Sequence, residues 1–343
     1  MSRTNNAAWL TGNNEILSVK PAPYTTPSAD YVLIKNHAIA INPVDSYMQA
    51  IGPQIFAQMF HPFILGSDIA GEIVEVGPNV TRFKPGDRVL GFALGSVNFA
   101  TPQGAFQEYT VVPAVVVAHI PDSLSYEHAA VLPMGLSVAG TALFDRDYLG
   151  LEYPSLTPKS TGKTLLVWGG ATSMSCNAIQ LAVAAGYEVI TTASPKNFEY
   201  VKKLGASQVF DYNSKTVVED LIQALQGKNM AGVFDGAGFG NSFDNCVAVI
   251  AKAEGRKFIA STQFLKDIPD GCGVTAKFVL GATLRENEVG KVIYEVFVPV
   301  ALAAGRYIAA PPPKMVGKGL EYLQAALDSW KAGVSAEKVV VTL

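Results

Sequence analysis

The centre of the chain reads Lys163-Thr-Leu-Leu-Val-Trp-Gly-Gly-Ala-Thr-Ser-Met-Ser-Cys-Asn-Ala-Ile-Gln-Leu-Ala182. Residues 164–168 form an apolar run of strand length that stops at two glycines. Beyond the glycines the apolar side chains recur with helical spacing, and a second apolar strand follows at residues 187–192. This stretch therefore predicts one βαβ unit of a doubly wound parallel sheet.

The turn between the first strand and the helix is built from small residues. Such a turn lets backbone N–H groups and a helix N-terminus approach an anion, and the natural ligand is the pyrophosphate of a dinucleotide. The usual fingerprint would place glycine near 173 and 175, where this chain has Ser173 and Ser175, whose hydroxyls can donate to a phosphate oxygen. The predicted phosphate-binding residues are Thr172, Ser173, Met174 and Ser175. The alternative is a ligand-free turn in which Ser173 or Ser175 caps the helix.

The end of the second predicted strand indicates which dinucleotide binds. An NAD-binding unit carries Asp or Glu there for the ribose 2′-hydroxyl, but residues 189–198 contain no acid. They contain Ser194-Pro195-Lys196-Asn197, which offers a hydroxyl and a cation to a 2′-phosphate. The sequence therefore predicts NADP(H). The alternative, in which Ser194 only caps the next helix and Lys196 is solvated, does not exclude this role.

Length and composition limit the class of protein. The 343 residues suit two domains, and a net charge of -3 with 16% charged residues indicates no nucleic-acid partner. Every apolar run is shorter than the ~18 residues that span a bilayer, and the N-terminus lacks a secretory profile. Three distant cysteines fit a reducing compartment, so we expect a cytoplasmic protein without a membrane partner. The histidines form no zinc-ligand pair; they are His37, His61, His119 and His128.

The predicted elements divide the chain into two α/β domains. Residues 1–125 alternate short apolar runs with Gly, Pro, Asn and Asp, which predicts a β-rich domain. Strand and helix signals then alternate through residues 126–299, which predicts a parallel sheet. We expect a last strand at residues 339–342 to return to the first sheet, so that residues from about 300 to 343 complete the first domain.

Three further helices are expected outside this alternation. The first covers residues 125–144, which are mostly small and apolar. The second covers residues 287–306 and is interrupted by Pro299. The third covers the amphipathic residues 317–332.

With these residues in hand, the chain resembles the medium-chain dehydrogenase/reductase superfamily over essentially its whole length. The motifs that carry the resemblance are Asn42-Pro43-Val44-Asp45, Gly66-Ser67-Asp68-Ile-Ala-Gly71, Gly86-Asp87-Arg88-Val89, Ala129-Ala130-Val131-Leu132-Pro133 and Leu204-Gly205-Ala206. The resemblance implies a GroES-like β-rich catalytic domain (residues 1–125 and about 300–343) and a Rossmann NADP-binding domain (residues 126–299).

The resemblance also bears on metal content, because alcohol dehydrogenases of this superfamily carry a catalytic zinc. The positions matching its first two ligands are Asn42 and Ser67, which are neither thiolate nor imidazole, and residues 90–113 contain no cysteine for a structural zinc lobe. Without a Lewis acid, alcohol oxidation loses its usual mechanism. The chain is more similar to the zinc-free quinone and enoyl reductases, and most to fungal NADPH-dependent enoyl reductase-like proteins, which include trans-acting partners of polyketide synthases. We therefore expect no metal.

Site residues follow from the resemblance by position. It implies that the cofactor contacts Asn42, Pro43, Val44, Asp45, Thr172, Ser173, Met174, Ser175, Ser194, Pro195, Lys196, Asn197, Tyr212, Ile259 and Ala260. The implied reaction is hydride transfer from NADPH to an activated C=C bond in an enone or enoyl thioester, or to a quinone. The enolate that develops needs a hydrogen-bond donor. Tyr47 is the first candidate and Asn42 the second, while water remains the alternative proton donor.

A second class of function stays open. The chain could be an NADPH-binding sensor, a structural protein or a synthase partner without turnover. A small-molecule α,β-unsaturated carbonyl, a quinone or a carrier-bound polyketide would be the substrate of the enzyme. The sequence is compatible with a monomer or with a homodimer joined through an edge strand at residues 275–280.

Overall fold

The computed structural model describes residues 4–343 and divides them into two compact units. Of the described residues, the first unit contains 4–134, 294–305 and 309–343, and the second contains 135–293 and 306–308. The sequence placed the first boundary near residue 125. The first unit runs on to Met134, whose N–H donates to the carboxylate of Asp68 at 2.6 Å and so ties the start of the next helix to this unit.

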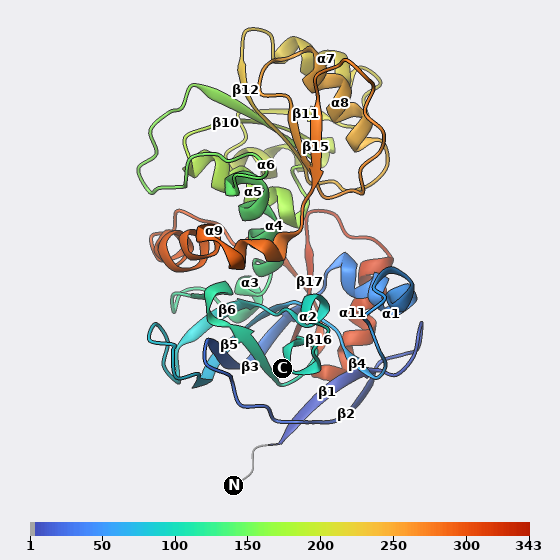
Figure 1. Ribbon diagram of the computed structural model, residues 1–343, viewed down its shortest axis with the longest axis vertical. Coiled ribbons are helices and arrows are strands. Elements are labelled where there is room, and N and C mark those ends of the chain that lie inside the picture. The colour runs from blue at the N-terminus through green and yellow to red at the C-terminus, as the bar shows by residue number, and fades with distance from the viewer. Residues whose placement is uncertain (1–3) are drawn as a thin grey trace. The chain divides into compact units, whose positions relative to one another are not determined.

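The first unit is built on two β-sheets (Figure 1). One sheet has the order β16-β17-β3-β5-β6-β8, with β7 also paired to β3, and the other has the order β2-β1-β4. The strands are β1 (Asn5–Leu10), β2 (Ser18–Ala22), β3 (Tyr31–Ala40), β4 (Phe63–Ile64), β5 (Asp68–Val76), β6 (Arg88–Phe92), β7 (Tyr109–Pro113), β8 (Val117–His119), β16 (Pro313–Lys318) and β17 (Lys338–Thr342).

Short helices connect these strands. They are α1 (Pro43–Ile55), α2 (Gly95–Asn98), η1 (Thr101–Gln103), η2 (Ala114–Val116), α3 (Tyr126–Ala129), α10 (Val298–Ala303), η6 (Leu320–Tyr322) and α11 (Leu323–Lys331). The closing strand β17 pairs antiparallel with β3, with Val340 opposite Ala40. The predicted return of the last strand to the first sheet is therefore confirmed, and the sheet joins residues from both ends of the chain.

The second unit is a parallel sheet with the strand order β11-β10-β9-β12-β14-β15, as predicted for a Rossmann domain. Its strands are β9 (Lys163–Trp168), β10 (Glu188–Ala193), β11 (Gln208–Asp211), β12 (Asn229–Asp235), β13 (Glu254–Gly255), β14 (Phe258–Ser261) and β15 (Thr275–Phe278). Its helices are α4 (Pro133–Phe144), α5 (Ser173–Ala184), η3 (Pro195–Asn197), α6 (Phe198–Lys203), α7 (Val217–Ala224), α8 (Ser242–Lys252), η4 (Gly281–Glu286) and α9 (Glu288–Lys291).

The core of the second unit lies between the sheet and helices α7 and α8. Leu166 and Ile190 from the sheet join Leu221 of α7 and Phe243 of α8 in one buried apolar cluster. Helices α5 and α6 lie on the other side of the same sheet (Figure 1). The central strands β9, β10, β12 and β14 are buried on both faces, which is the pattern of a parallel sheet covered by helices on each side.

The helix expected over residues 125–144 is two helices, α3 and α4. Pro133 begins α4, and a proline disfavours helical geometry in the residue before it, so the chain breaks between Ala129 and Pro133.

The predicted interruption near Pro299 takes an unexpected form. Helix α9 runs into a π-helical segment, η5 (Val292–Phe297), and then into α10, where Pro299 lies in the first turn. A wider π turn accommodates the proline, which has no N–H and whose ring crowds the preceding turn.

The helix expected over residues 317–332 begins only at Leu323. Gly317 and Lys318 belong to β16, where Lys318 pairs with Thr342 of β17. Pairing with the distant strand β17 determines the structure of these two residues. The local amphipathic pattern does not indicate this pairing.

None of the helices among residues 4–343 combines the length and the apolar character that crossing a bilayer requires.

Candidate functional site

Sheet register brings three polar residues to one end of the first unit. Ala40, the last residue of β3, lies opposite Asp68 of β5 and opposite Val340 of β17. Because β3 runs antiparallel to both neighbours, its carboxyl end meets their amino ends. Asn42 follows β3, Asp68 opens β5 and Lys338 opens β17, so the three side chains converge.

These three side chains form a closed hydrogen-bonded network. Asn42 Nδ2 donates to Asp68 Oδ2 at 2.9 Å, and Lys338 Nζ donates to Asn42 Oδ1 at 2.6 Å. Lys338 Nζ also lies 2.9 Å from Asp68 Oδ2, in an ion pair whose side chains are 5% and 0% exposed. The remaining oxygen, Asp68 Oδ1, accepts the Met134 N–H. Both carboxylate oxygens of Asp68 therefore have fixed donors.

Asp45 lies beside this network in the first turn of α1. Its carboxylate accepts the backbone N–H of Asn42 at 2.8 Å, which caps the helix. The pKa of Asp45 is raised to about 7, mainly by burial and also by the negative charge of Asp68, against the lowering effect of the Asn42 N–H and the ammonium of Lys338. This region therefore holds a carboxyl that titrates near neutral pH.

The donor set does not fit zinc. Zinc sites use thiolate, imidazole and carboxylate ligands, whereas Asn42 offers an amide and Ser67 a hydroxyl. The oxygens that could bind a cation, Asn42 Oδ1 and Asp68 Oδ2, already accept from the ammonium of Lys338. Among residues 4–343 no group of three or more His, Cys, Asp or Glu side chains is arranged to hold a metal.

The first candidate proton donor, Tyr47, has a different environment from Asn42. Tyr47 is 53% exposed and packs edge-to-face against Trp330 of α11, with ring centroids 6.2 Å apart. Asn42 is 2% exposed and uses its amide oxygen and an N–H within the network. Of the two predicted residues, only Tyr47 presents its side chain to solvent. The intervening Pro43 and Val44 form the first turn of α1.

The turn of small residues predicted between the first strand and the helix is present in the second unit, between β9 and α5. Thr172 caps α5, accepting the N–H of Ser175 at 3.2 Å, so the cap is neither of the two serines considered from the sequence. Ser175 Oγ donates to the carbonyl of Trp168. Ser173 Oγ is buried and has no hydrogen-bond partner among residues 4–343. Ser173 is the first residue of α5, and the next residue, Met174, lies in the same first turn.

Two glycines make this turn tight. Gly169 has a φ of 77°, in the region that side chains rarely adopt. A Cβ on Gly170 would lie 2.3 Å from Thr191 Oγ1, so the close packing of β9 against β10 requires glycine there. The turn can therefore approach a phosphate through its backbone, as a dinucleotide requires.

The segment predicted to read the 2′-phosphate follows β10. Ser194 Oγ accepts from Asn197 Nδ2 at 3.1 Å, and Pro195 opens the short helix η3. Lys196 is exposed and forms no ion pair with the described residues. Tyr212, at the end of the neighbouring strand β11, is 42% exposed. A hydroxyl, a free cation and an exposed ring therefore lie at the carboxyl ends of β10 and β11.

Ile259 and Ala260 are placed differently from the other predicted cofactor contacts. Both are 0% exposed inside β14, with strands paired on either side, so their side chains belong to the core. The polar end of this strand is Ser261, whose Oγ donates to Asp235 Oδ2 at 3.0 Å. Burial raises the pKa of Asp235, and the hydroxyls of Ser242 and Ser261 lower it.

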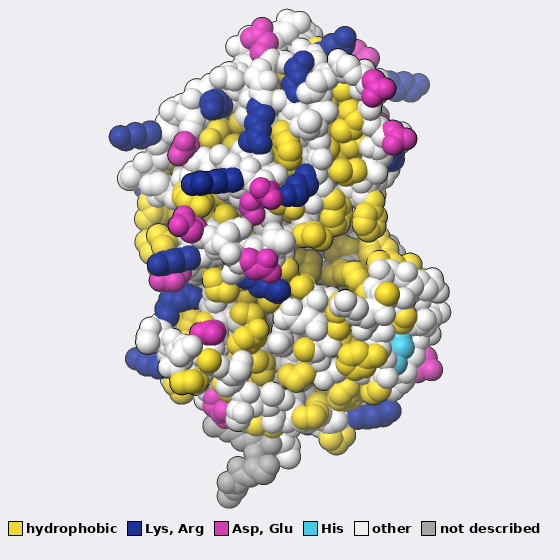
Figure 2. Space-filling view, in the orientation of Figure 1, with side chains coloured by type: hydrophobic (Ala, Val, Ile, Leu, Met, Phe, Trp, Pro, Cys, Tyr) yellow, Lys and Arg dark blue, Asp and Glu magenta, His cyan; other side chains and the backbone are white. Residues whose placement is uncertain are grey.

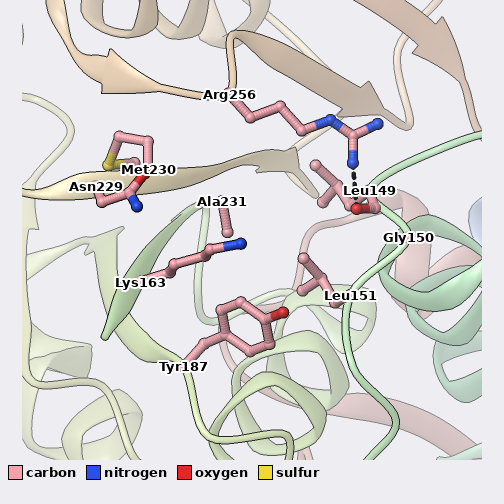
Figure 3. Close-up of a pocket in the computed structure, with 9 residues that line it drawn as sticks. All are labelled: Leu149, Gly150, Leu151, Lys163, Tyr187, Asn229, Met230, Ala231 and Arg256. Carbon is pink, nitrogen blue, oxygen red and sulfur yellow. Dashed lines mark hydrogen bonds between the residues drawn. The ribbon is translucent and has the colours of Figure 1, made fainter. Parts of the chain in front are cut away.

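Figure 3 shows a pocket of about 240 Å³ in the second unit. It lies at the amino ends of the strands, which is not where a dinucleotide is expected to bind. Its walls include Lys163 and Asn229, the first residues of β9 and β12, and ligands of such sheets bind at the carboxyl ends. Arg256 is held at its rim by hydrogen bonds to the carbonyls of Leu149 and Tyr148.

Comparison with known proteins agrees with this architecture. The alcohol dehydrogenase GroES-like domain family matches residues 28–122, and the zinc-binding dehydrogenase family matches residues 174–285. The dehydrogenase azaJ of Aspergillus niger is 49% identical over 99% of this chain and 99% of its own. This chain belongs to the medium-chain dehydrogenase/reductase superfamily. Members of this superfamily are oxidoreductases that use a nicotinamide cofactor, and this protein is an oxidoreductase of that kind.

Two further superfamily members cover the chain. The trans-enoyl reductase himH of Aspergillus japonicus is 39% identical over 100% of this chain and 98% of its own. The crystal structure of an alcohol dehydrogenase superfamily protein from Novosphingobium aromaticivorans superposes with a TM-score of 0.82 at 26% identity, over 99% of this chain and 100% of that one. The GroES-like and Rossmann domains expected from the sequence are thereby confirmed.

Sequence reasoning missed Lys338 and its contacts with Asn42 and Asp68. Lys338 lies 296 residues from Asn42, so no local spacing connects them. One signal was available: a lysine opens the apolar run Lys338-Val-Val-Val341, and lysine is almost never buried unless it is paired.

Proposed function

We propose that this protein is a zinc-independent reductase that transfers hydride from NADPH to an activated C=C bond, in an enone or enoyl thioester, or to a quinone. The observation that carries the proposal is the donor set of the first unit, where Asn42 and Ser67 replace metal ligands and Lys338 supplies the cation. A centre of this composition has no Lewis acid to stabilise an alkoxide. The reaction then depends on the hydride of the cofactor and on hydrogen-bond donors.

The residues after β10 support NADPH over NADH. The 2′-phosphate adds negative charge, which the exposed ammonium of Lys196 and the hydroxyl of Ser194 can bind. No carboxylate in residues 189–198 repels it. In this proposal the pyrophosphate binds at the N-terminus of α5, where Ser173 keeps a free hydroxyl. Ile259 and Ala260 contribute only by positioning the end of β14.

Two observations support the proposed substrate class: the similarity to reductases and the distribution of charged side chains on the surface. A superfamily member at 39% identity is a trans-enoyl reductase, and a carrier-bound polyketide is therefore a candidate substrate beside free enones and quinones. On the face shown in Figure 2, Lys and Arg alternate with Asp and Glu and form no basic field for nucleic acid.

Tyr47 is the proposed proton donor or enolate partner. Its ring is half exposed, whereas the amide of Asn42 is engaged with Lys338 and Asp68. A phenol can donate a hydrogen bond to the carbonyl oxygen on which negative charge develops after hydride transfer. Asn42 then acts by holding the start of α1 and not as a direct donor.

The experiment measures consumption of NADPH and NADH with a panel of enones, a thioester of crotonate and a naphthoquinone, with and without a chelator. We expect kcat/KM for NADPH to exceed that for NADH by about tenfold or more, equivalent to ~1.4 kcal/mol. The chelator should leave both rates unchanged. Lys196→Ala should reduce the preference for NADPH, while Lys203→Ala, an exposed lysine of the adjacent helix, is the matched control.

Three results would contradict the proposal. A preference for NADH would remove the 2′-phosphate argument. Loss of activity with the chelator, restored by zinc, would remove the zinc-independent mechanism. Tight NADPH binding without consumption across the whole panel would favour a nucleotide-binding sensor.

A further inference from the structure

The pocket at the amino ends of β9 and β12 has no part in the proposed reaction. Its volume of about 240 Å³ is below the ~300–1,000 Å³ of pockets for drug-sized ligands, so it suits a smaller molecule. Lys163 is the first residue of β9, and the predicted dinucleotide turn follows the last residue of the same strand. The 6 residues of β9, at ~3.3 Å each, separate the two ends by about 20 Å. A ligand in this pocket is therefore distinct from the cofactor.

A β-bulge in β12 helps to open the pocket. Met230 lies opposite Thr164 of β9, and Gly232 lies opposite the next residue, Leu165, so Ala231 is an extra residue in β12. A bulge bends its strand and redirects side chains, and bulges are common next to active sites. The side chain of the extra residue is only a methyl group, which leaves space between the starts of the strands and the loop of residues 149–151.

The walls of the pocket carry positive charge. Lys163 and Arg256 both line it, and none of the described residues that line it is Asp or Glu. The carboxylate at the start of β10, Glu188, is already paired with Lys228 at 2.7 Å. The ammonium of Lys163 has no ion-pair or hydrogen-bond partner among residues 4–343. An anion in the pocket would therefore meet two cations and no opposing charge from the walls.

Arg256 and Tyr187 retain donors that the protein leaves unused. The Arg256 guanidinium donates to the carbonyls of Leu149 and Tyr148, which fixes its position and uses two of its five N–H groups. Burial lowers the pKa of Arg256, as expected for a cation without a counter-charge. The Tyr187 hydroxyl accepts the Glu152 N–H at 3.2 Å, and its own proton has no acceptor among the described residues.

The directions of these side chains indicate what they can bind together. In Figure 3 the Lys163 ammonium and the Tyr187 hydroxyl point towards the loop that Arg256 holds. Carboxylate and phosphate oxygens accept strong hydrogen bonds from donors of this kind. Leu151 and Met230 add apolar walls, and burying apolar area of a ligand against them is favourable. The pocket thus combines an oxyanion site with a short apolar surface.

We propose that this pocket binds a small organic anion, in which a carboxylate or phosphate head group contacts Lys163, Arg256 and Tyr187 and a short apolar part contacts Leu151 and Met230. The inference goes beyond the proposed function and depends neither on NADPH nor on turnover. Carboxylates and phosphomonoesters share the required head-group chemistry, and the test separates them.

Four probes resolve the contributions of charge and apolar contact. Phenyl phosphate and benzoate carry the two head groups, inorganic phosphate lacks the apolar part, and benzyl alcohol lacks the charge. Ligand-observed NMR titrations of the full chain at low ionic strength give the Kd of each probe. We expect a Kd of about 1 mM for the better of the two organic anions, with benzyl alcohol and inorganic phosphate each weaker by about tenfold or more.

Substitutions then locate the bound anion. Lys163→Met should weaken binding by about tenfold or more, while Lys163→Arg keeps the charge and should stay within about threefold of the wild type. Lys159→Met changes an exposed lysine that does not line the pocket, and this matched control should bind as the wild type does. Because Lys163 is exposed and unpaired, Lys163→Met should leave the thermal unfolding midpoint unchanged. Tyr187→Phe, a second variant, should weaken binding by about two- to tenfold.

Several results would overturn the inference. They are no measurable binding of either organic anion at about 10 mM, tenfold above the expected Kd, equal affinity of the wild type and Lys163→Met, and equal affinity for benzyl alcohol and the anions. Loss of binding when NADPH is added at saturation would place the anion at the predicted cofactor site instead. A failure of the proposed function would appear as NADPH that is not consumed, and that result would leave this binding unchanged.

Discussion

Lys338 and Asp68 form the most deeply buried ion pair among residues 4–343, with side-chain exposures of 5% and 0%. Lys338→Met would leave the Asp68 carboxylate buried without a cation, and breaking a buried pair from one side costs about 3–5 kcal/mol. We expect urea denaturation to show a loss of that size in the free energy of unfolding. The double variant Asp68→Asn/Lys338→Met removes both charges and should recover more than half of the loss. An equal loss in the two variants would contradict a charge effect.

Asp45 should make the stability of the wild type depend on pH. Its folded pKa of about 7 lies above its ordinary value of 3.8, so the folded state holds a proton that the unfolded state releases between these values. The stabilisation is fully present below about pH 4 and is lost as the pH rises towards 7. Asp45→Asn should abolish this decline, which denaturation at several pH values will measure. An unchanged slope in the variant would mean that another group is responsible.

Substitution of Tyr47 should affect catalysis and leave stability almost unchanged, because the residue is 53% exposed. Tyr47→Phe should change the free energy of unfolding by less than about 0.5 kcal/mol. If Tyr47 donates the proton, kcat should fall by about 10²-fold or more, as for other general acids. Tyr322→Phe, at 43% exposure in the same unit, is the control and should retain full activity. A fall in kcat of less than a few fold would assign the proton to water.

At the level of elements, the β9-α5-β10 unit was predictable because its signals are local. The apolar run of β9, the glycines after it and the helical spacing of α5 all lie within one stretch of sequence. The structure adds that Thr172 is the helix cap, which leaves Ser173 Oγ without a hydrogen-bond partner among residues 4–343. The cap residue was not predictable, since three neighbouring hydroxyl side chains can each fill it.

Ser173 and Ser175 should therefore respond differently to the same substitution. Ser173→Ala removes a hydroxyl that has no partner among the described residues, so stability should hold while the Kd for NADPH rises by about two- to tenfold, the value of one hydrogen bond. Ser175→Ala removes a hydroxyl bonded to the Trp168 carbonyl and should lower stability by about 1 kcal/mol. Calorimetric titration with NADPH and urea denaturation measure the two effects. The opposite pattern would place the phosphate elsewhere.

The elements predicted least well are those that distant pairing decides. The start of the helix after β16 was placed at Gly317 because the amphipathic pattern extends that far, but pairing with β17 keeps Gly317 and Lys318 in a strand. Pro299 was expected to interrupt a helix, and it does so through a π-helical turn. The local sequence pattern indicates neither the pairing with a distant strand nor the π-helical turn that precedes the proline.

For the whole molecule, the fold was largely predictable and the candidate centre of the first unit only in part. Repeated strand and helix signals predict the Rossmann sheet, and the motif around Asn42 indicates where chemistry is expected. The sequence did not reveal that Lys338 is the cation of this network. Lys338 reaches Asn42 only because β17 returns to β3 from the other end of the chain. Contacts of this sequence separation arise from topology and leave no periodic signal.

In the proposed reaction, hydride passes from NADPH to a carbon–carbon double bond without a metal. The most direct test incubates the chelator-treated protein with an enone and NADPH deuterated at C4, and locates the label in the product by mass spectrometry and NMR. We predict that one deuterium appears at the β-carbon of the saturated ketone, at a rate that the chelator does not change. Deuterium at a carbinol carbon, or a labelled product formed only after zinc is restored, would contradict this mechanism.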